Sequence, residues 1–320
     1  IDYNGDGVEQ LNEFEVAPFK DQANYVRAFV QSNEFVRGYY NKFTESVNFQ
    51  PAAVWKGKEG IRKFLARFSN QFVFRAESRS RSQEPGLAYN PLAGITRWED
   101  TSLVSVSSSF RNTLYFDRMN TKFSADLNFL NNNNKTLLVN GFEYRSVMSN
   151  GINLRWNFYK AFTFNFSYNN GKSERRSEFF GNNNYSLKLD DLKPGITWQP
   201  STSFRIEANY EFSSKRNTFG EGEEKALMHK GGVESSYRIV NRGNLQVSAN
   251  IIRINYNGEP NTPLAFEMLE GFQPGNNATW SVSYQQSLSK FLQLNLVYDG
   301  RRSEGSKTVH VGSIQVRAHF

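Results

Sequence analysis

Hydrophobic and polar residues alternate with a period of two along most of the chain. The pattern is clearest over residues 280–285, 292–298 and 313–320, where apolar side chains occupy one face and polar side chains the other. It recurs upstream in segments that begin at Phe123 and Phe162. Successive side chains of a β-strand point to opposite faces of its sheet. The sequence therefore predicts a sheet with one apolar face and one face that meets water.

The length of the alternating segments separates two kinds of β protein. A soluble β-sandwich alternates as well, but its strands usually run about five or six residues. The segments of this chain run about 9 to 15 residues, which suits strands that cross a membrane at a tilt. We therefore expect membrane-spanning strands.

The links between the segments also alternate in length, as periplasmic turns and external loops do in outer-membrane barrels. Short links are predicted at residues 131–134, 159–161, 199–203, 240–243 and 288–290. Longer links facing the other way are predicted at residues 170–184, 213–225, 257–276 and 299–306. Two of the outward links, near Asp117 and Asn150, are short and depart from this pattern.

These features predict an all-β fold, an antiparallel transmembrane β-barrel of about 14 strands between Tyr39 and Phe320. We assign residues 25–320 to the barrel and residues 1–24 to an N-terminal loop and linker. The expected location is the bacterial outer membrane. Aromatic residues gather at predicted strand ends, among them Trp156, Trp198 and Tyr237, where an amphipathic ring suits the headgroup level.

Composition narrows the class further. Aromatic residues make up 15% of the chain while the mean hydropathy is −0.62, so apolar residues are abundant but diluted by polar ones.

No apolar run approaches the length of a transmembrane helix, and no signal peptide follows Ile1, so we expect a mature chain or a fragment. The net charge of +7 is spread among 31 acidic residues, which argues against a nucleic-acid partner. The absence of cysteine excludes disulfides, cysteine zinc sites and thiol nucleophiles.

The segment "DYNGDGVEQLNE", residues 2–13, matches the twelve-residue calcium loop at its diagnostic positions. Oxygen ligands at alternate positions wrap a hard cation, and Gly7 permits the turn that folds the loop back. A turn rich in Asn and Gly that holds no metal is the alternative. We expect a structural Ca²⁺ ion that pins this segment to the barrel, held by Asp2, Asn4, Asp6, the Val8 carbonyl, Gln10 and Glu13.

Two stretches resemble known outer-membrane proteins. The end "GSIQVRAHF" resembles the C-terminal signal of outer-membrane barrels, a terminal Phe preceded by alternating apolar residues that the barrel-assembly machinery reads. The stretch "IDYNGDGVEQLNEFEVAPFKDQANYVRAF" looks like a segment of large outer-membrane proteins of the Bacteroidota, including those related to the type IX secretion translocon. This resemblance implies that the chain is the C-terminal barrel of a longer polypeptide.

Catalysis finds little support in the sequence, and we expect no enzyme. A hydrolase that uses a Ser and a His on neighbouring strands stays an outside alternative, with His229 and Ser235 as the pair. Cationic residues in the predicted outer loops suggest contact with lipopolysaccharide phosphates or an acidic partner, beside the simpler reading of solvated loop charge. They are Arg175, Arg176, Lys215, Arg216, Arg301 and Arg302.

Two functions remain open. The first is a subunit or anchor of a larger envelope complex for secretion, uptake or barrel assembly, with outer-membrane lipids and protein partners around it. The second is a diffusion channel or small-molecule transporter, for which about 14 strands leave room. The predicted inward face carries mixed charges that can pair with each other or line a wet pore. They include Glu143, Arg145, Arg155, Arg205, Glu207, Glu211, Lys230, Glu234, Arg238, Gln293 and Arg317.

Overall fold

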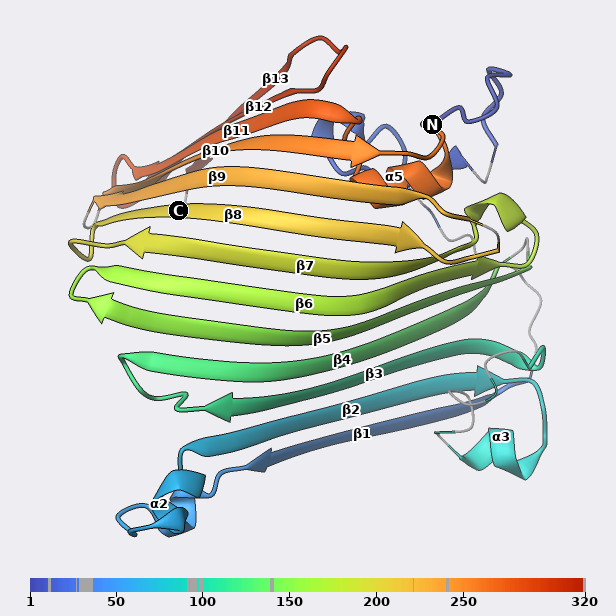
Figure 1. The fold of residues 1–320 in the computed structure, drawn as a ribbon. Helices are drawn as coiled ribbons and strands as arrows, with labels where there is room; N and C mark the ends of the chain where they lie inside the picture. Colours follow the sequence, from blue (N-terminus) through green and yellow to red (C-terminus); the bar gives the residue numbers. More distant parts are fainter. Residues whose placement is uncertain are drawn as a thin grey trace.

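The fold is a single antiparallel sheet of thirteen strands within the described residues (Figure 1). The computed structural model describes residues 1–10, 13–26, 28, 37–90, 92, 97, 100–138, 141–220, 222–239 and 242–318. Each strand pairs with its neighbours in the chain, so the spatial order is the sequence order. The strands are β1 (Tyr39–Phe49), β2 (Phe68–Ser80), β3 (Leu103–Phe116), β4 (Phe123–Leu138), β5 (Gly141–Tyr159), β6 (Phe162–Ser177), β7 (Tyr185–Trp198), β8 (Phe204–Asn217), β9 (Lys225–Ile239), β10 (Gly243–Tyr256), β11 (Gly275–Ser287), β12 (Leu292–Arg302) and β13 (Val309–Ala318).

The strand count is thirteen rather than the predicted 14, and two of the predicted links are wrong. Residues 131–134, four consecutive asparagines, lie inside β4, and Asn150 lies inside β5. The asparagines have turn propensity, but the ladder satisfies them: Asn133 accepts hydrogen bonds from the hydroxyls of Tyr144 at 3.0 Å and Ser146 at 2.8 Å. Cross-strand pairing therefore overrides local preference here.

The two ends of the sheet carry different connections. At one end, which we call the turn end, β5, β7, β9 and β11 are joined to the next strand by residues 160–161, 199–203, 240–242 and 288–291. These short links confirm the predictions at those positions. Residues 117–122, near Asp117, were predicted as an outward link but join β3 to β4 at the turn end, where the longer residues 50–67 also join β1 to β2. The other end, the loop end, carries residues 81–102, 178–184, 218–224, 257–274 and 303–308.

Short helices lie in the connections. They are η2 (Lys20–Gln22), α1 (Ala52–Trp55), α2 (Ile61–Leu65), α3 (Pro85–Tyr89), η3 (Gly181–Asn183) and α5 (Pro263–Leu269). Among the described residues, none of the helices is sufficiently long and apolar to traverse a membrane.

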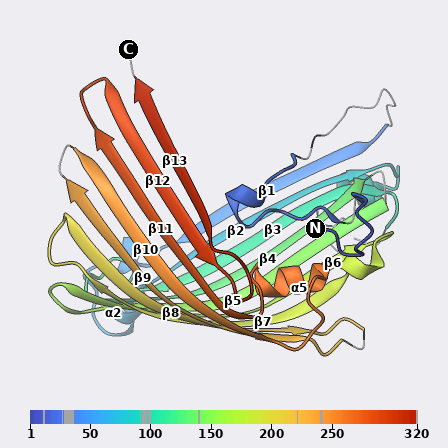
Figure 2. The ribbon, with the colours of Figure 1, turned by 90° about the horizontal axis from the view of Figure 1, so that it is seen from above.

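The sheet is open along one side. Within the described residues β1 pairs only with β2, and β13 pairs only with β12. Figure 2 shows the sheet curled into a trough whose concave side holds α5 and the N-terminal segment. The predicted closure into a barrel is therefore not seen among the described residues. The last two residues of the predicted C-terminal signal, 319–320, lie outside the described residues.

The two faces of the sheet exchange character partway along the strands. On the convex face near the turn end the side chains are apolar, whereas near the loop end the apolar side chains point to the concave face. Two neighbours on β10 show the change directly: Ile251 on the convex face is 74% exposed, and Ile252 on the concave face is 1% exposed. Alternation predicts that adjacent residues face opposite ways, and here both happen to be apolar.

The concave apolar patch near the loop end is the core of the molecule. Strands β7, β9 and β10 contribute Leu187, Met228 and Ile254, and α5 covers them with Met268 and Leu269. The helix begins at Thr262, whose hydroxyl accepts a hydrogen bond from the Ala265 amide at 3.1 Å. At its other end Lys215 of β8 donates to the Glu267 carbonyl at 3.3 Å and to the Glu270 carboxylate at 2.8 Å.

Candidate functional site

The N-terminal loop folds into the hydrogen-bonded turn that its sequence predicts. Asp2 accepts hydrogen bonds from the amides of Gly5 at 2.7 Å and Gly7 at 3.0 Å. The Asp6 carboxylate accepts one from the Val8 amide at 2.7 Å. Gly7 has a φ of 72°, which glycine adopts without strain. The backbone thus turns the two carboxylates toward the inside of the loop.

Glu13 closes the loop. Its two carboxylate oxygens accept hydrogen bonds from the amides of Tyr3 at 3.2 Å and Gln10 at 3.1 Å, and its carbonyl accepts one from the Ile1 amino group at 2.8 Å. The residue is only 4% exposed. The first and the last ligand position of the predicted calcium loop are therefore held in one compact unit.

The structure brings the six predicted ligand residues into this unit. In the part of the chain that the structure describes, no group of three or more His, Cys, Asp and Glu side chains is arranged to hold a metal ion. The three carboxylates of the motif, on Asp2, Asp6 and Glu13, therefore do not converge on one metal position in this structure. Each carboxylate oxygen that accepts an amide proton keeps a second lone pair. The donor set of hard oxygens fits Ca²⁺ rather than a softer metal.

The residues that follow the loop dock on the concave face. Glu15 lies 3.5 Å from Arg175 of β6, which also lies 3.2 Å from Glu143 of β5. Both side chains of the Glu15 and Arg175 pair are nearly buried, at 11% and 13% exposure. Taking charges out of water is costly unless they are paired, so this ion pair ties the segment to β6.

The N-terminal segment makes a second contact with the sheet at β12, six strands from β6. The Phe19 ring meets Phe272 edge-on with centroids 5.6 Å apart, and the Arg301 guanidinium of β12 lies 4.3 Å over the Phe19 ring. Arg301 also donates a hydrogen bond to Asp21. Between this part of the segment and β10 to β13 lies a cavity of about 250 Å³, lined in part by Asp299. The segment therefore bridges β6 and β12 across the trough.

Burial sets the protonation of the docked groups. Burial raises the pKa of the Glu15 carboxyl from its ordinary 4.5, and Arg175 opposes that rise. Burial also raises the pKa of the Tyr3 hydroxyl, which stays protonated. The hydrogen bond from Arg301 lowers the pKa of Asp21 from its ordinary 3.8. The two anchoring carboxyls thus respond to acid in opposite directions.

The convex face carries an apolar belt toward the turn end. Directly paired residues share a face, so Leu114, Leu127 and Ile152 form one row across β3, β4 and β5. Leu127 is 50% exposed and Ile152 is 40% exposed. Other large exposed side chains of the belt include Trp156, Ile196, Trp198, Tyr210, Val233, Tyr237, Val247, Ile251, Ile314 and Val316. An exposed apolar surface of this extent marks an interaction with something apolar.

An aromatic row borders the belt at the turn end. Ring contacts link Trp156, Phe158, Phe162, Trp198, Phe204 and Tyr237 in sequence order along β5 to β9. This arrangement confirms that Trp156, Trp198 and Tyr237 gather at strand ends.

The concave face opposite the belt is polar. Lys193 lies 2.6 Å and Lys230 3.8 Å from opposite oxygens of Glu211, so three neighbouring strands share one ion network. Asp126 accepts a hydrogen bond from Asn153 at 2.8 Å in the same face. The inward residues predicted from sequence lie on this face, as their strand registers require.

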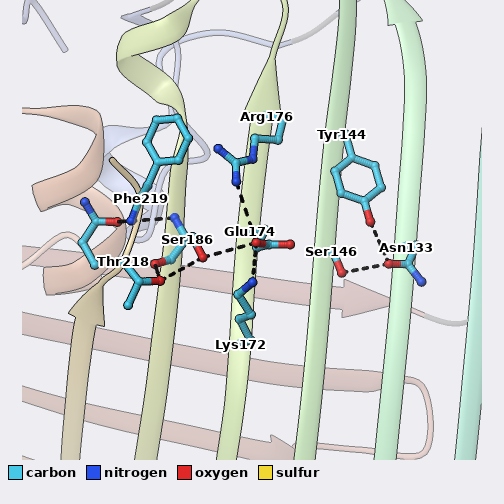
Figure 3. A network of polar contacts seen from close by, with 10 residues as sticks. Asn133, Tyr144, Ser146, Lys172, Glu174, Arg176, Ser186, Thr218 and Phe219 are labelled. Carbon is cyan, nitrogen blue, oxygen red and sulfur yellow. Dashed lines mark hydrogen bonds and ion pairs between the residues drawn. The ribbon is translucent and has the colours of Figure 1, made fainter. Parts of the chain in front are cut away.

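Above the belt, toward the loop end, the convex face is polar too. Figure 3 shows a network in which Glu174 of β6 contacts Lys172 at 2.6 Å, Ser186 at 3.2 Å and Arg176 at 3.9 Å. The predicted outer-loop cations divide between the two faces: Arg175, Lys215 and Arg301 contact acids on the concave side, whereas Arg176 lies on the convex side, over the Phe219 ring.

The histidine and serine weighed for catalysis do not meet. His229 and Ser235 both lie on β9, six residues apart, which is about 20 Å along a strand. The Nδ1 atom of His229 instead shares a hydrogen bond with the Tyr210 hydroxyl at 2.6 Å.

Among solved structures, the chain is similar to domains of autotransporters. No family model matches the chain, and no curated protein does. The translocator domain of the autotransporter NalP from Neisseria meningitidis is 11% identical, with 90% of each chain covered and a TM-score of 0.30. The β domain of the Bordetella autotransporter BrkA is 9% identical, covering 88% of this chain and 99% of its own, at 0.29. The transport unit of AIDA-I from Escherichia coli is 8% identical, covering 91% and 93%, at 0.29. Similarity at this level indicates neither a family nor an activity.

From the directions of the Glu15 and Asp21 pKa shifts, we predict that the N-terminal segment docks on the sheet most strongly in mild acid. A carboxyl with a higher pKa when docked binds its proton more tightly in that state, so Glu15 favours docking as pH falls through its raised value toward 4.5. Asp21 favours docking above 3.8 and loses that effect below it. In chelator, hydrogen exchange of residues 1–10, corrected for intrinsic rates, should slow from neutral pH toward 4.5 and quicken below 3.8. Glu15→Gln should remove the slowing and keep the quickening; an unchanged profile in this variant would contradict the assignment.

Proposed function

We propose that the chain is a wall sector of an outer-membrane β-barrel that serves as an anchor or subunit of a larger envelope assembly. The observation that carries the proposal is the exposed apolar belt on the convex face, set opposite a polar concave face. The belt lies in lipid, and the polar wall lies in the lumen. The chain resides in the bacterial outer membrane, with its turn end in the periplasm and its loop end outside.

Solvation supports the placement in lipid. Burying apolar surface contributes about 25 cal/mol per Å², and half-exposed side chains such as Leu127 and Val233 gain nothing from facing water. Every backbone polar group in lipid must be paired within the protein, which strands achieve through their ladder. The pairing of each strand from β1 to β13 with its neighbours meets that requirement along most of the sheet, with gaps at the two edges and at Lys193 and Pro194 of β7.

The two open edges support a larger assembly. Each edge strand has backbone amides and carbonyls without a ladder partner in the described residues, and open edges do not persist in the hydrocarbon layer. Further strands, from the same polypeptide or from a partner, therefore complete the wall between β1 and β13. The resemblance of the N-terminal stretch to Bacteroidota outer-membrane proteins related to the type IX translocon favours a secretion assembly.

The filled trough supports an anchor over a simple pore. The N-terminal segment and α5 lie on the concave side (Figure 2). Arg175 and Arg301 hold the N-terminal segment, and Lys215 holds the end of α5. The second candidate, a diffusion channel, is favoured by the charged concave wall around Glu211. Single-channel recording of the full polypeptide in planar bilayers separates them: we expect no steady conductance, and co-purifying envelope proteins. A steady open conductance without partners would support the channel instead.

The belt predicts how charge on each face affects insertion. Val247 lies on the convex face of β10, and its neighbour Gln246 lies exposed on the concave face. Val247→Arg should destabilise the inserted protein by about 2–4 kcal/mol, the usual cost of Arg at mid-membrane. Gln246→Arg should change stability by less than about 0.5 kcal/mol, as on an open surface. Denaturant titration in lipid vesicles measures the change in stability of both variants. Equal changes for the two would contradict the placement of the belt in lipid.

We also propose that residues 2–13 bind one structural Ca²⁺ ion through the six ligand residues. When bound, the ion supplies a fixed charge that holds the carboxylates of Asp2, Asp6 and Glu13 together. The chain's own amide hydrogen bonds orient these carboxylates before any ion arrives. The ion therefore completes a loop that is already folded, and it favours the docked state by mass action.

Two matched variants test the calcium proposal. Glu13→Gln removes the bidentate ligand, whereas Glu9→Gln removes the same charge from a position that the motif does not use as a ligand. Calorimetric titration of the full polypeptide with Ca²⁺ should show at least tenfold weaker binding for the first variant and little change for the second. Loss of binding in both, or in neither, would contradict the ligand assignment.

A further inference from the structure

Four cations lie directly opposite one another on the convex face, one on each of four adjacent strands. The strand registers pair Lys172 of β6 with Lys188 of β7, Lys188 with Arg216 of β8, and Arg216 with Lys225 of β9. We call these four residues the cation row. Strands lie about 4.8 Å apart, so the row runs about 14 Å across the sheet.

Most of the cation row has no acidic partner. Lys188, Arg216 and Lys225 are exposed and form no ion pair within the described residues, whereas Lys172 lies 2.6 Å from Glu174. Asp190, two residues from Lys188 on the same face, accepts hydrogen bonds from Asn170 at 2.7 Å and Tyr168 at 3.1 Å. Like charges directly opposite each other destabilise a sheet. An external anion would neutralise the row.

The cation row lies at a constant height above the apolar belt. The top of the belt on these strands is itself a cross-strand row of Tyr168, Leu192 and Phe212. Each of these residues is four positions from a member of the cation row on its own strand, about 13 Å along a strand and about 9 Å in height at a tilt near 45°. Headgroups occupy the first several ångströms beyond the hydrocarbon layer, and long cationic side chains reach down toward them.

The chemistry of the row selects phosphate. Guanidinium and ammonium groups form strong charge-assisted hydrogen bonds with phosphate oxygens. Cations at this height, on the face that meets lipid, meet lipid phosphates before any soluble anion. An acidic polypeptide would have to reach the same height against the membrane surface. The geometry therefore favours a lipid.

We propose that the cation row binds the phosphate groups of anionic lipid in the outer leaflet, the bisphosphorylated lipid A of lipopolysaccharide above all. This inference rests on the proposed placement of the belt in the outer membrane. It differs from the loop cations predicted from sequence, because Arg175, Lys215 and Arg301 turn inward and only Arg216 belongs to the row. The row gives the wall a fixed lipid contact at one place on its circumference, over β6 to β9.

The test compares two triple variants of the full polypeptide in detergent. The row variant is Lys188→Gln, Arg216→Gln and Lys225→Gln. The control variant, Lys160→Gln, Arg242→Gln and Lys290→Gln, removes the same charge from exposed positions at the turn end. Purified bisphosphorylated lipid A and its dephosphorylated form are titrated, with bound lipid counted by native mass spectrometry. The native protein and the control should prefer the bisphosphorylated form by about tenfold or more, and the row variant should lose that preference.

Further variants and competing ligands ensure that every outcome either supports or contradicts the proposal. Lys188→Arg, Arg216→Lys and Lys225→Arg preserve charge and should restore the preference, which separates lost binding from lost folding. Equal binding of the dephosphorylated lipid, displacement by equimolar inorganic phosphate, or tighter binding of polyglutamate would each overturn the inference. Insertion into vesicles of neutral lipid is measured in parallel. If no variant inserts, the proposed membrane placement fails; if all insert and none prefers phosphate, only the row inference fails.

Discussion

The continuous hydrogen-bonded ladder is the constraint on which the rest of the structure depends. Once thirteen strands pair in sequence order, each residue's face follows from its register, and rows of side chains run across neighbouring strands wherever the register is continuous. The belt, the polar wall and the cation row are all such rows. A slip of one residue in any strand would move its side chains to the opposite face, so the ladder fixes every surface at once.

Strand length explains why the faces exchange character. A tilted strand crosses the hydrocarbon layer in about 9–11 residues, and β4 to β6 run 16, 19 and 16 residues. The residues beyond the layer meet water on the convex side, so apolar side chains there turn inward. They form the core that α5 covers, with Leu187 and Ile252 each 1% exposed. In the proposed membrane placement, the docking site of the N-terminal segment lies where the strands extend beyond the hydrocarbon layer.

Much of this could be predicted from the sequence. The two-residue alternation predicted the faces of the belt correctly, and the link lengths predicted the short links of the turn end correctly from residue 159 onward. The asparagine run failed because side-chain hydrogen bonds across strands outweigh turn propensity. The core was missed although its signal is present: in β7 the apolar phase shifts between Leu189 and Leu192, and in β10 between Ile251 and Ile252. The open edges could not be predicted, since closure depends on shear and strand number rather than on any single residue.

The docked N-terminal segment and the strand ladder constrain different features of the sheet. Ladder bonds hold neighbouring strands together, but they constrain only weakly the curvature of a sheet that is open at two edges. Glu15 is held by Arg175 of β6 and Asp21 by Arg301 of β12, six strands away, and only residues 16–20 connect the two anchors. A short segment fixed at both ends sets the distance between its anchors, because an extended chain spans at most about 3.5 Å per residue. The segment therefore limits how far the trough can open.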